Sequence, residues 1–413
     1  MSNFRLQTLS IVGATALAAI VASPVAAQEA ESNNKASTSL KIDFLDAAYM
    51  PGPNQVYVSG HYGLIGKIEV TDSGAKVSRV ANTPNADFTA MERVTDTEVL
   101  IGGSTGKLFR FDGESVTEVA QLSEYEEPIL DIAANGQNVW VVGARGLISR
   151  STDGGQNFEE VEIRDVTLPK TEFPGAQTAD WYFGVSNLDS ETIEFTAFKD
   201  GKPAVDEEDY IMYPDEGFVQ FQSDLDMDPP PSVAFKFNPG PPFRAGDVSW
   251  NVALLSDNTV TLCGEFGMIL QSYDNGETWI RRDTEIVPRE PEPAYWMTGV
   301  QKGSEVWLGG AAGVSQRSTD GGETWTDNPK PGREGIFGIT LTEDNSPVIS
   351  GAVGLIGTMV GDDWKVADRT ALKLLSWLRT PVSLPDGSIL VTGGRAAAIR
   401  FKDGEFQRVP VSY

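Results

Sequence analysis

The feature that most constrains this chain is a short pattern that recurs seven times between residues 56 and 400. Each copy has an apolar alternating segment, a Gly-x-x-Gly or a near variant, and a second short apolar segment. Alternating segments predict β-strands, and the glycines permit a positive φ in a tight connection, so each copy predicts a hairpin. The first glycines are Gly60, Gly103, Gly143, Gly264, Gly310, Gly351 and Gly394.

The spacing of these glycines indicates the architecture. Their intervals are 43, 40, 121, 46, 41 and 43 residues, and a fixed period of this size is typical of propeller blades. One more apolar segment precedes each hairpin and an outer segment follows it, which makes four strands in each unit. No helical periodicity recurs, so a helical solenoid is disfavoured. We therefore predict an all-β fold, a seven-bladed β-propeller with four-stranded antiparallel blades, over residues 39–413.

A second pattern follows the hairpins in three places. Residues 151–158, 272–279 and 318–325 match the Asp-box form Ser-x-Asp-x-Gly-x-Thr-Trp, and weaker copies surround Asp72, Asp112, Asp362 and Asp403. The carboxylate of such a turn accepts hydrogen bonds from turn amides, and the aromatic residue packs against a neighbouring sheet. We therefore predict structural roles, rather than catalysis or metal binding, for its main residues. These are Asp153, Asp274, Asp320, Trp279 and Trp325.

The single long interval predicts an insertion after the third blade. Subtracting one blade of about 43 residues leaves about 78, which we place at residues 165–246. Two degenerate blades are the alternative, but proline runs interrupt the segment and it has no Gly-x-x-Gly hairpin, which favours a small β-rich insertion.

The insertion is also acidic. From residue 165 to residue 244 it contains sixteen acidic and five basic residues, a net charge of -11. We expect it above the face that carries the hairpins. It could be a lid that selects a basic or apolar partner, a calcium site at residues 206–209, or simply a solvated segment; no spaced oxygen-ligand loop supports calcium.

The N-terminus predicts export. Arg5 precedes an apolar stretch at residues 9–21, and small residues end at Ala27, which together are typical of a signal peptide over residues 1–27. The apolar stretch is shorter than the ~20 residues that span a bilayer, which disfavours a membrane anchor. Residues 28–38 are polar, and we expect a disordered lead-in.

Charge and composition exclude several functions. A formal net charge of -27 disfavours nucleic acids and anionic lipids as partners, because both require a basic surface. The chain has one cysteine, Cys263, and one histidine, His61, so it cannot form an internal disulfide and poorly supports zinc chemistry or a Ser-His-Asp triad. We expect a buried, inert thiol at Cys263, and no metal, cofactor or catalytic residues.

The hairpins followed by Arg-Ser-Thr-Asp-Gly-Gly-x-x-Trp/Phe resemble the photosystem II assembly and stability factor family, seven-bladed propellers with bacterial neuraminidase repeats. The resemblance covers about residues 40–410 apart from the insertion, and it suggests a bacterial relative. It implies a chaperone-like protein of the periplasm, or of the thylakoid lumen in a photosynthetic organism. It also implies a protein partner from a membrane or envelope complex. The acidic charge and the insertion depart from the photosynthetic members, which are expected to have an arginine-rich surface.

The residues between the paired glycines differ from blade to blade, which is how repeat proteins place recognition groups on a fixed scaffold. We therefore predict a non-enzymatic, monomeric propeller that binds a protein on the face formed by the hairpins. The candidate partner-binding residues are His61, Tyr62, Arg145, Glu265, Phe266 and Arg395.

The alternative function is a sialidase-like glycoside hydrolase, because those enzymes also carry Asp boxes. Such an enzyme is expected to need an arginine cluster, a Tyr/Glu pair and an acidic proton donor. An Arg-Ile-Pro signature should also precede its first repeats, and it is absent from the matching region here.

Overall fold

The computed structural model describes residues 42–71, 74–173, 175, 180–183, 185–238, 248–282 and 294–412. The expected signal peptide and lead-in lie outside the described residues. The fold is all-β, and each helix in the described residues is a three-residue 3-10 turn. None of these helices is long and apolar enough to cross a membrane.

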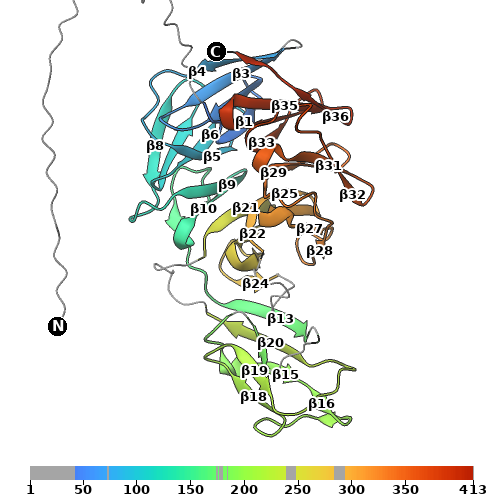
Figure 1. The fold of residues 1–413 in the computed structure, drawn as a ribbon. Helices are drawn as coiled ribbons and strands as arrows, with labels where there is room; N and C mark the ends of the chain where they lie inside the picture. The colour runs from blue at the N-terminus through green and yellow to red at the C-terminus, as the bar shows by residue number, and fades with distance from the viewer. Residues whose placement is uncertain are drawn as a thin grey trace, which may run out of the picture. The chain divides into compact units, whose positions relative to one another are not determined.

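The first three sheets are antiparallel and follow the chain order (Figure 1). Each begins with an inner strand, and the next strands add outward in sequence. The first sheet also holds the C-terminal strand β37 (Val411–Ser412), which pairs in parallel with β4. The strands are β1 (Asp46–Met50), β2 (Gln55–Ser59), β3 (Ile65–Thr71) and β4 (Gly74–Arg79); β5 (Phe88–Arg93), β6 (Val99–Gly103), β7 (Lys107–Phe111) and β8 (Val116–Gln121); β9 (Ile129–Asn135), β10 (Asn138–Gly143), β11 (Ile148–Ser151) and β12 (Glu159–Glu160).

Four further sheets after residue 248 repeat this order. Their strands are β21 (Trp250–Ser256), β22 (Thr259–Gly264), β23 (Ile269–Ser272) and β24 (Trp279–Arg281); β25 (Trp296–Lys302), β26 (Glu305–Gly310), β27 (Ser315–Ser318) and β28 (Thr326–Asp327); β29 (Ile336–Leu341), β30 (Pro347–Gly351), β31 (Ile356–Val360) and β32 (Asp363–Val366); β33 (Leu378–Ser383), β34 (Ile389–Gly393), β35 (Ala397–Lys402) and β36 (Glu405–Arg408).

The inner strands contact one another in a cycle. In the order β1, β5, β9, β21, β25, β29 and β33, each contacts the next, and β33 contacts β1. Close approach is required at Gly338 in β29, where an added Cβ would lie 1.5 Å from the carbonyl oxygen of Arg379 in β33. The first and the last inner strands, β1 and β33, therefore meet.

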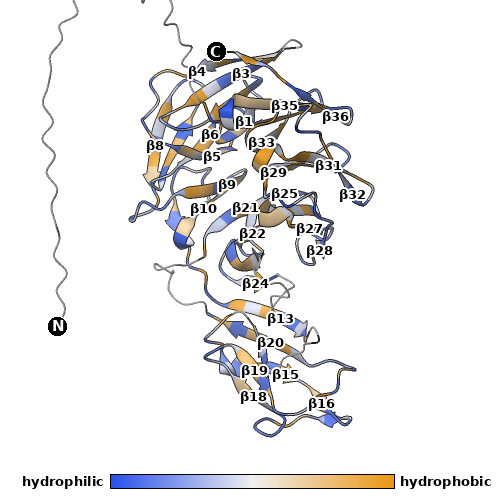
Figure 2. Cartoon of the chain, viewed as in Figure 1, coloured by the Kyte–Doolittle hydropathy of each residue, from blue (hydrophilic) through white to orange (hydrophobic). Residues whose placement is uncertain are grey.

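The core lies between neighbouring sheets. In β10, Val139 and Val141 pack toward the second sheet in one apolar cluster, whereas Trp140 and Val142 belong to another cluster that includes the fourth sheet. Because both faces of such a strand are buried, its sequence is an almost continuous apolar run. Figure 2 shows apolar residues along the strands and hydrophilic residues at many turns.

The insertion extends the fourth sheet outward. Its first strand, β13 (Val166–Glu172), pairs in parallel with the outer strand β24, which gives the sheet order β15-β20-β13-β24-β23-β22-β21. A three-stranded sheet, β14-β19-β18, and the hairpin of β16 and β17 complete it (Figure 1). The other elements are β14 (Asp180–Tyr182), η2 (Ser190–Thr192), β15 (Glu194–Thr196), β16 (Phe198–Lys199), β17 (Lys202–Pro203), β18 (Tyr210–Tyr213), β19 (Phe218–Phe221) and β20 (Ser232–Phe237).

This position corrects the expectation that the insertion covers the hairpin face. The insertion follows β12, the outer strand of the third sheet, and it pairs with the outer edge of the fourth sheet. The backbone N–H and C=O groups of β24 are available there for pairing. It also shares a core with the propeller sheets: Val166, Leu168 and Trp181 belong to the same buried cluster as Trp140 and Trp279. The expected end of the insertion, residue 246, lies outside the described residues.

Candidate functional site

The connections between second and third strands share an uncommon backbone conformation. Five of them are 3-10 turns: η1 (Ala144–Gly146), η3 (Glu265–Gly267), η4 (Ala311–Gly313), η5 (Ala352–Gly354) and η6 (Gly394–Ala396). The middle residue of each is left-handed, as is Tyr62 in the first sheet. Positive φ values are unfavourable for residues other than Gly, Asn and Asp. Val353, at φ 53°, is an outlier because it is β-branched.

The seventh turn corrects the register of the repeat. By sequence its first glycine is Gly394, but in the structure Gly393 caps the turn as Gly143 does in the third sheet. Ala396, at φ 51°, then takes the place of the second glycine. Arg395 remains the residue at the tip.

The turns lie at the end of the sheets where the inner strands begin. Hydrogen bonds connect some of them to the start of the inner strand of the next sheet: Phe88 N–H donates to the carbonyl group of Gly60, and Gly146 N–H donates to that of Val248. Asp87 accepts from the amide of Tyr62 at 2.9 Å, and Asp43 accepts from the amide of Arg395 at 2.7 Å. These turns are therefore held against the neighbouring sheet, and we call this end of the sheets the turn face.

The six candidate partner-binding residues all lie on the turn face, in four different turns. His61, Tyr62, Arg145, Phe266 and Arg395 are exposed, whereas Glu265 is half-buried and accepts a hydrogen bond from the amide of Ser249 at 2.8 Å. His61 Nδ1 lies 3.3 Å from an oxygen of Asp87. The structure brings His61 and Tyr62 together, with ring centroids 6.1 Å apart.

Exposed large apolar side chains are also present on this face. Tyr62, Phe266 and Val353 are 77%, 60% and 61% exposed at the turn tips. Tyr125 and Leu375 are exposed on the connections that lead to β9 and β33, and these connections lie against the turns of Gly106 and Gly354. Sequence analysis did not select Tyr125, Val353 or Leu375, because solvent exposure of a connection cannot be read from its residues.

The three Asp turns lie at the other end, between the third and outer strands. Asp153 accepts from the amides of Gln156 and Asn157 at 2.9 and 3.0 Å, and hydrogen bonds from Asn157 hold its pKa well below the usual range. Burial would raise the pKa of Asp320, but hydrogen bonds from Thr324 outweigh it and lower this pKa to about 2. Asp274 is held in the same way, by Thr278.

These turns also connect neighbouring sheets. Arg110 of the second sheet donates to the carbonyl groups of Gly154 and Gly155, and Gln271 of the fourth sheet donates to Gly321. The tryptophans that follow two of the turns, Trp279 and Trp325, are buried. Each of the three carboxylates therefore accepts hydrogen bonds within its own turn, and this arrangement stabilises the turn.

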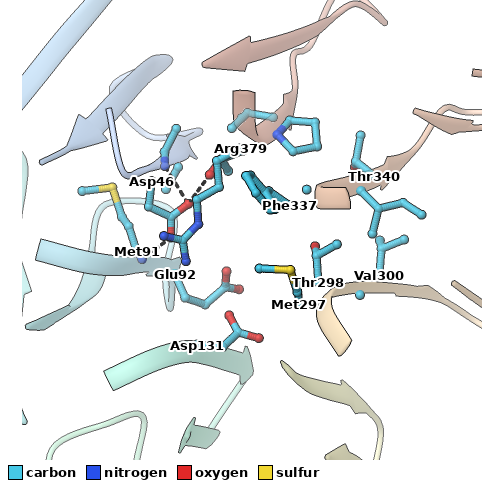
Figure 3. A pocket seen from close by; sticks show the side chains of 18 of the residues that line it. Asp46, Met91, Glu92, Asp131, Met297, Thr298, Val300, Phe337, Thr340 and Arg379 are labelled. Carbon is cyan, nitrogen blue, oxygen red and sulfur yellow. Dashed lines mark hydrogen bonds between the residues drawn. The ribbon is translucent and has the colours of Figure 1, made fainter. Parts of the chain in front are cut away.

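The inner strands enclose a cavity of about 580 Å³. Every inner strand contributes to its lining, so it forms a channel along the centre of the ring (Figure 3). One wall carries Asp46, Glu92 and Asp131 on the consecutive strands β1, β5 and β9. The opposite wall carries the apolar side chains of Met297, Val300 and Phe337 beside the hydroxyl groups of Thr298 and Thr340 (Figure 3).

Two of the channel carboxylates join inner strands. Asp46 accepts from the amide of Met91 at 2.6 Å and from the hydroxyl of Thr380 at 2.6 Å, so it contacts both neighbouring strands. Asp131 accepts from the amide of Ala253, in β21, at 3.0 Å. Figure 3 shows the side chain of Glu92 pointing into the space between them.

The channel makes ionisation of its acids unfavourable. Burial raises the pKa of Glu92 to about 8, and the nearby charges of Asp131 and Asp46 add to the rise. Burial also raises the pKa of Asp131 to about 7 and raises the pKa of Asp46, where the positive charge of Arg379 acts in the opposite direction. Asp46, Glu92 and Asp131 are half-buried, so part of each residue remains accessible to solvent.

Sequence analysis missed the channel residues. The available signal was a charged residue inside an apolar inner strand, as in Ile129-Leu130-Asp131-Ile132. In the described part of the chain, no three His, Cys, Asp or Glu side chains lie close enough together to hold a metal ion.

No protein-family model matches the chain, and no curated protein matches it either. Solved structures do. The WD40 β-propeller domain of Doa1 is 10% identical with a TM-score of 0.52, over 88% of this chain and 93% of that chain. The extracellular domain of a one-component system from B. thetaiotaomicron is 8% identical with a TM-score of 0.51, over 88% of this chain and 40% of that chain. YCF48 bound to a D1 peptide is 12% identical with a TM-score of 0.47, over 78% and 81%. At these identities the similarity establishes the fold alone, and the fold is a β-propeller.

Proposed function

We propose that this chain is an exported, non-enzymatic, seven-bladed β-propeller that binds a protein partner on its turn face. The blade number is supported by the cycle of inner strands from β1 to β33, each of which begins a sheet whose strands add outward. In this proposal the fourth blade carries the insertion on its outer strand. Export rests on the sequence of residues 1–27.

The observation that carries the proposal is the set of exposed side chains on left-handed turns. A left-handed backbone conformation costs about 1–2 kcal/mol for an ordinary residue, and six turns have one at the middle position. Backbone strain of this kind is typical of functional sites, which favours a binding role for the side chains at the tips. Hydrogen bonds hold turns to their own blade, as from Ala352 to Gly335, and some also to the next blade, as from Gly146 to Val248. Rigid tips lose little conformational entropy when a partner binds.

The chemistry of the tips suits a protein surface. Aromatic residues and arginine dominate the energetics of protein interfaces, and Tyr62, Phe266, Arg145 and Arg395 are of these types. Exposed apolar side chains grouped on one face are also typical of interaction sites. By contrast, the carboxylates of the three Asp turns are engaged in hydrogen bonds, so nothing there favours the sialidase-like alternative.

The kind of partner follows from the sequence resemblance. An exported propeller similar to the photosystem II assembly factors would hold a membrane or envelope protein during assembly, in the periplasm or, in a photosynthetic organism, in the thylakoid lumen. The three Asp turns would then be the Asp boxes of that family, and the chain would act as a monomer.

Site-specific photocrosslinking in the native host tests the proposal. A photoreactive amino acid at Tyr62 and at Phe266 should capture the same protein, whereas one at Val360, equally exposed at the β31–β32 turn, should not. The double substitution Tyr62→Ala, Phe266→Ala should reduce co-purification of that protein at least tenfold and leave the unfolding midpoint unchanged. Equal capture from Val360, or undiminished co-purification, would contradict the proposal.

A further inference from the structure

We propose that the central channel binds an organic cation, an alkylammonium group whose charge lies against Glu92 and its neighbouring carboxylates and whose apolar stem lies against the opposite wall. The site is separate from the turn face, so this inference does not depend on the proposed function. It rests on the cavity, its charge and its apolar wall.

The cavity has the size of a ligand site. Small-molecule sites in proteins occupy about 300–1,000 Å³, and the channel holds about 580 Å³. Its exposed lining is mainly polar, and the apolar side chains of Met297, Val300 and Phe337 lie across the channel from the carboxylates. Gly338 keeps β29 against β33, so the width of the channel is fixed by backbone contact.

The charges of the channel favour a cation. Its lining contains three carboxylates and two arginines, and the guanidinium of Arg93 lies 3.4 Å from Asp96, which is not a lining residue. Arg379 therefore balances only part of the negative charge (Figure 3). The raised pKa of Glu92 has the same origin, because burial and two acidic neighbours disfavour its charged form. A bound cation would relieve this unfavourable interaction.

The carboxylates differ in their freedom to bind. Asp46 and Asp131 accept hydrogen bonds from neighbouring inner strands. Glu92 points into the channel and is the group best placed to approach a ligand. We therefore assign Glu92 as the principal contact, with the two aspartates contributing longer-range attraction.

An organic cation fits better than a metal ion. No three acidic, histidine or cysteine side chains in the described residues are close enough to chelate a metal. A metal ion also prefers oxygen ligands on all sides, whereas Met297, Val300 and Phe337 offer apolar side chains. An alkylammonium ion uses both walls, since its ammonium group requires the carboxylates and its carbon chain contacts the apolar residues.

The same chemistry could come from a free amine or from a lysine side chain of a partner, and the experiment separates these sources. Calorimetry at pH 6.5 and at pH 9 would use the purified chain with hexylammonium, with hexanoate and hexanol as anionic and neutral isosteres, and with the peptide Ala-Ala-Lys-Ala-Ala. The protein variants would be Glu92→Gln and a matched control, Glu114→Gln, which removes the same charge from an exposed turn.

We expect hexylammonium to bind, with an affinity that rises about tenfold between pH 6.5 and pH 9 as Glu92 ionises. Glu92→Gln should weaken binding at least tenfold at pH 9 and reduce the pH dependence to the part that Asp131 contributes, whereas Glu114→Gln and Tyr62→Ala should have no effect. Binding of the peptide but not of hexylammonium would assign the channel to a lysine of a partner and support the same chemistry. The proposal is overturned if neither cation binds, if hexanol or hexanoate binds equally well, or if Glu92→Gln binds like the wild type.

Discussion

The channel carboxylates make the stability of the propeller depend on pH, and Glu92 allows the size of the effect to be worked out. Its pKa rises from an ordinary value of 4.5 to about 8 in the folded protein. A raised pKa means that folding favours the protonated form. The stability is therefore fully present below about pH 4.5 and is lost as the pH rises through about 8.

The magnitude follows from the pKa difference. At about 1.4 kcal/mol for each pH unit, full ionisation of Glu92 would remove about 5 kcal/mol. Glu92 is half-buried and open to solvent, so screening reduces this value, and we expect a loss of about 2–3 kcal/mol between pH 5 and pH 9. Asp131, whose pKa is about 7, titrates in the same range and adds to the loss.

The assay is urea denaturation of the wild type and of Glu92→Gln at pH 5, 7 and 9. The glutamine cannot ionise, so the variant should match the wild type within about 1 kcal/mol at pH 5 and exceed its free energy of unfolding by about 2–3 kcal/mol at pH 9. Glu114→Gln, which removes an exposed charge, should follow the wild type at each pH. Parallel pH profiles for the wild type and Glu92→Gln would refute the reasoning.

Two further predictions concern the contacts between sheets. Arg150 of the third sheet donates to the carbonyl group of Asn275 and to the side chain of Glu277. Arg150→Ala should therefore lower the free energy of unfolding, measured by urea denaturation, by about 2–3 kcal/mol. Arg150→Lys should restore less than half of this stability, and full restoration by lysine would show that charge alone matters. Replacing residues 166–237 by a flexible linker should lower the free energy of unfolding by about 3 kcal/mol or more, because Trp279 loses the apolar contacts that the insertion supplies. An unchanged unfolding midpoint would mean that the insertion does not stabilise the sheets.

The sequence repeats predicted most of the fold because each hairpin depends on residues that are close together in sequence. Each hairpin is specified by alternating apolar residues and by the glycines of its turn, and the structure has strands at all seven copies. The register failed once, at Gly393 and Gly394. Two adjacent glycines and a left-handed alanine, Ala396, leave the position of the turn ambiguous in sequence.

The placement of the insertion could not be predicted because it depends on a non-local contact. Its sequence showed that strands were present, but not that β13 would pair with β24, more than a hundred residues later. Parallel pairing at an exposed edge leaves no pattern in either strand that distinguishes it from pairing within the insertion. The acidic charge suggested a lid, although charge alone does not specify a position.

The channel was missed for a related reason, and the same contacts explain its chemistry. Ring closure brings together strands that begin at residues 46, 88, 129 and 378, so each charged residue looks isolated in its own apolar segment. Asp46 and Asp131 serve the fold, since their carboxylates accept amide hydrogens from the next inner strand. Substituting either would therefore remove a connection as well as a charge. Glu92 carries its charge into the channel without joining two strands in this way, which is why a single substitution there can separate binding and titration from the integrity of the ring.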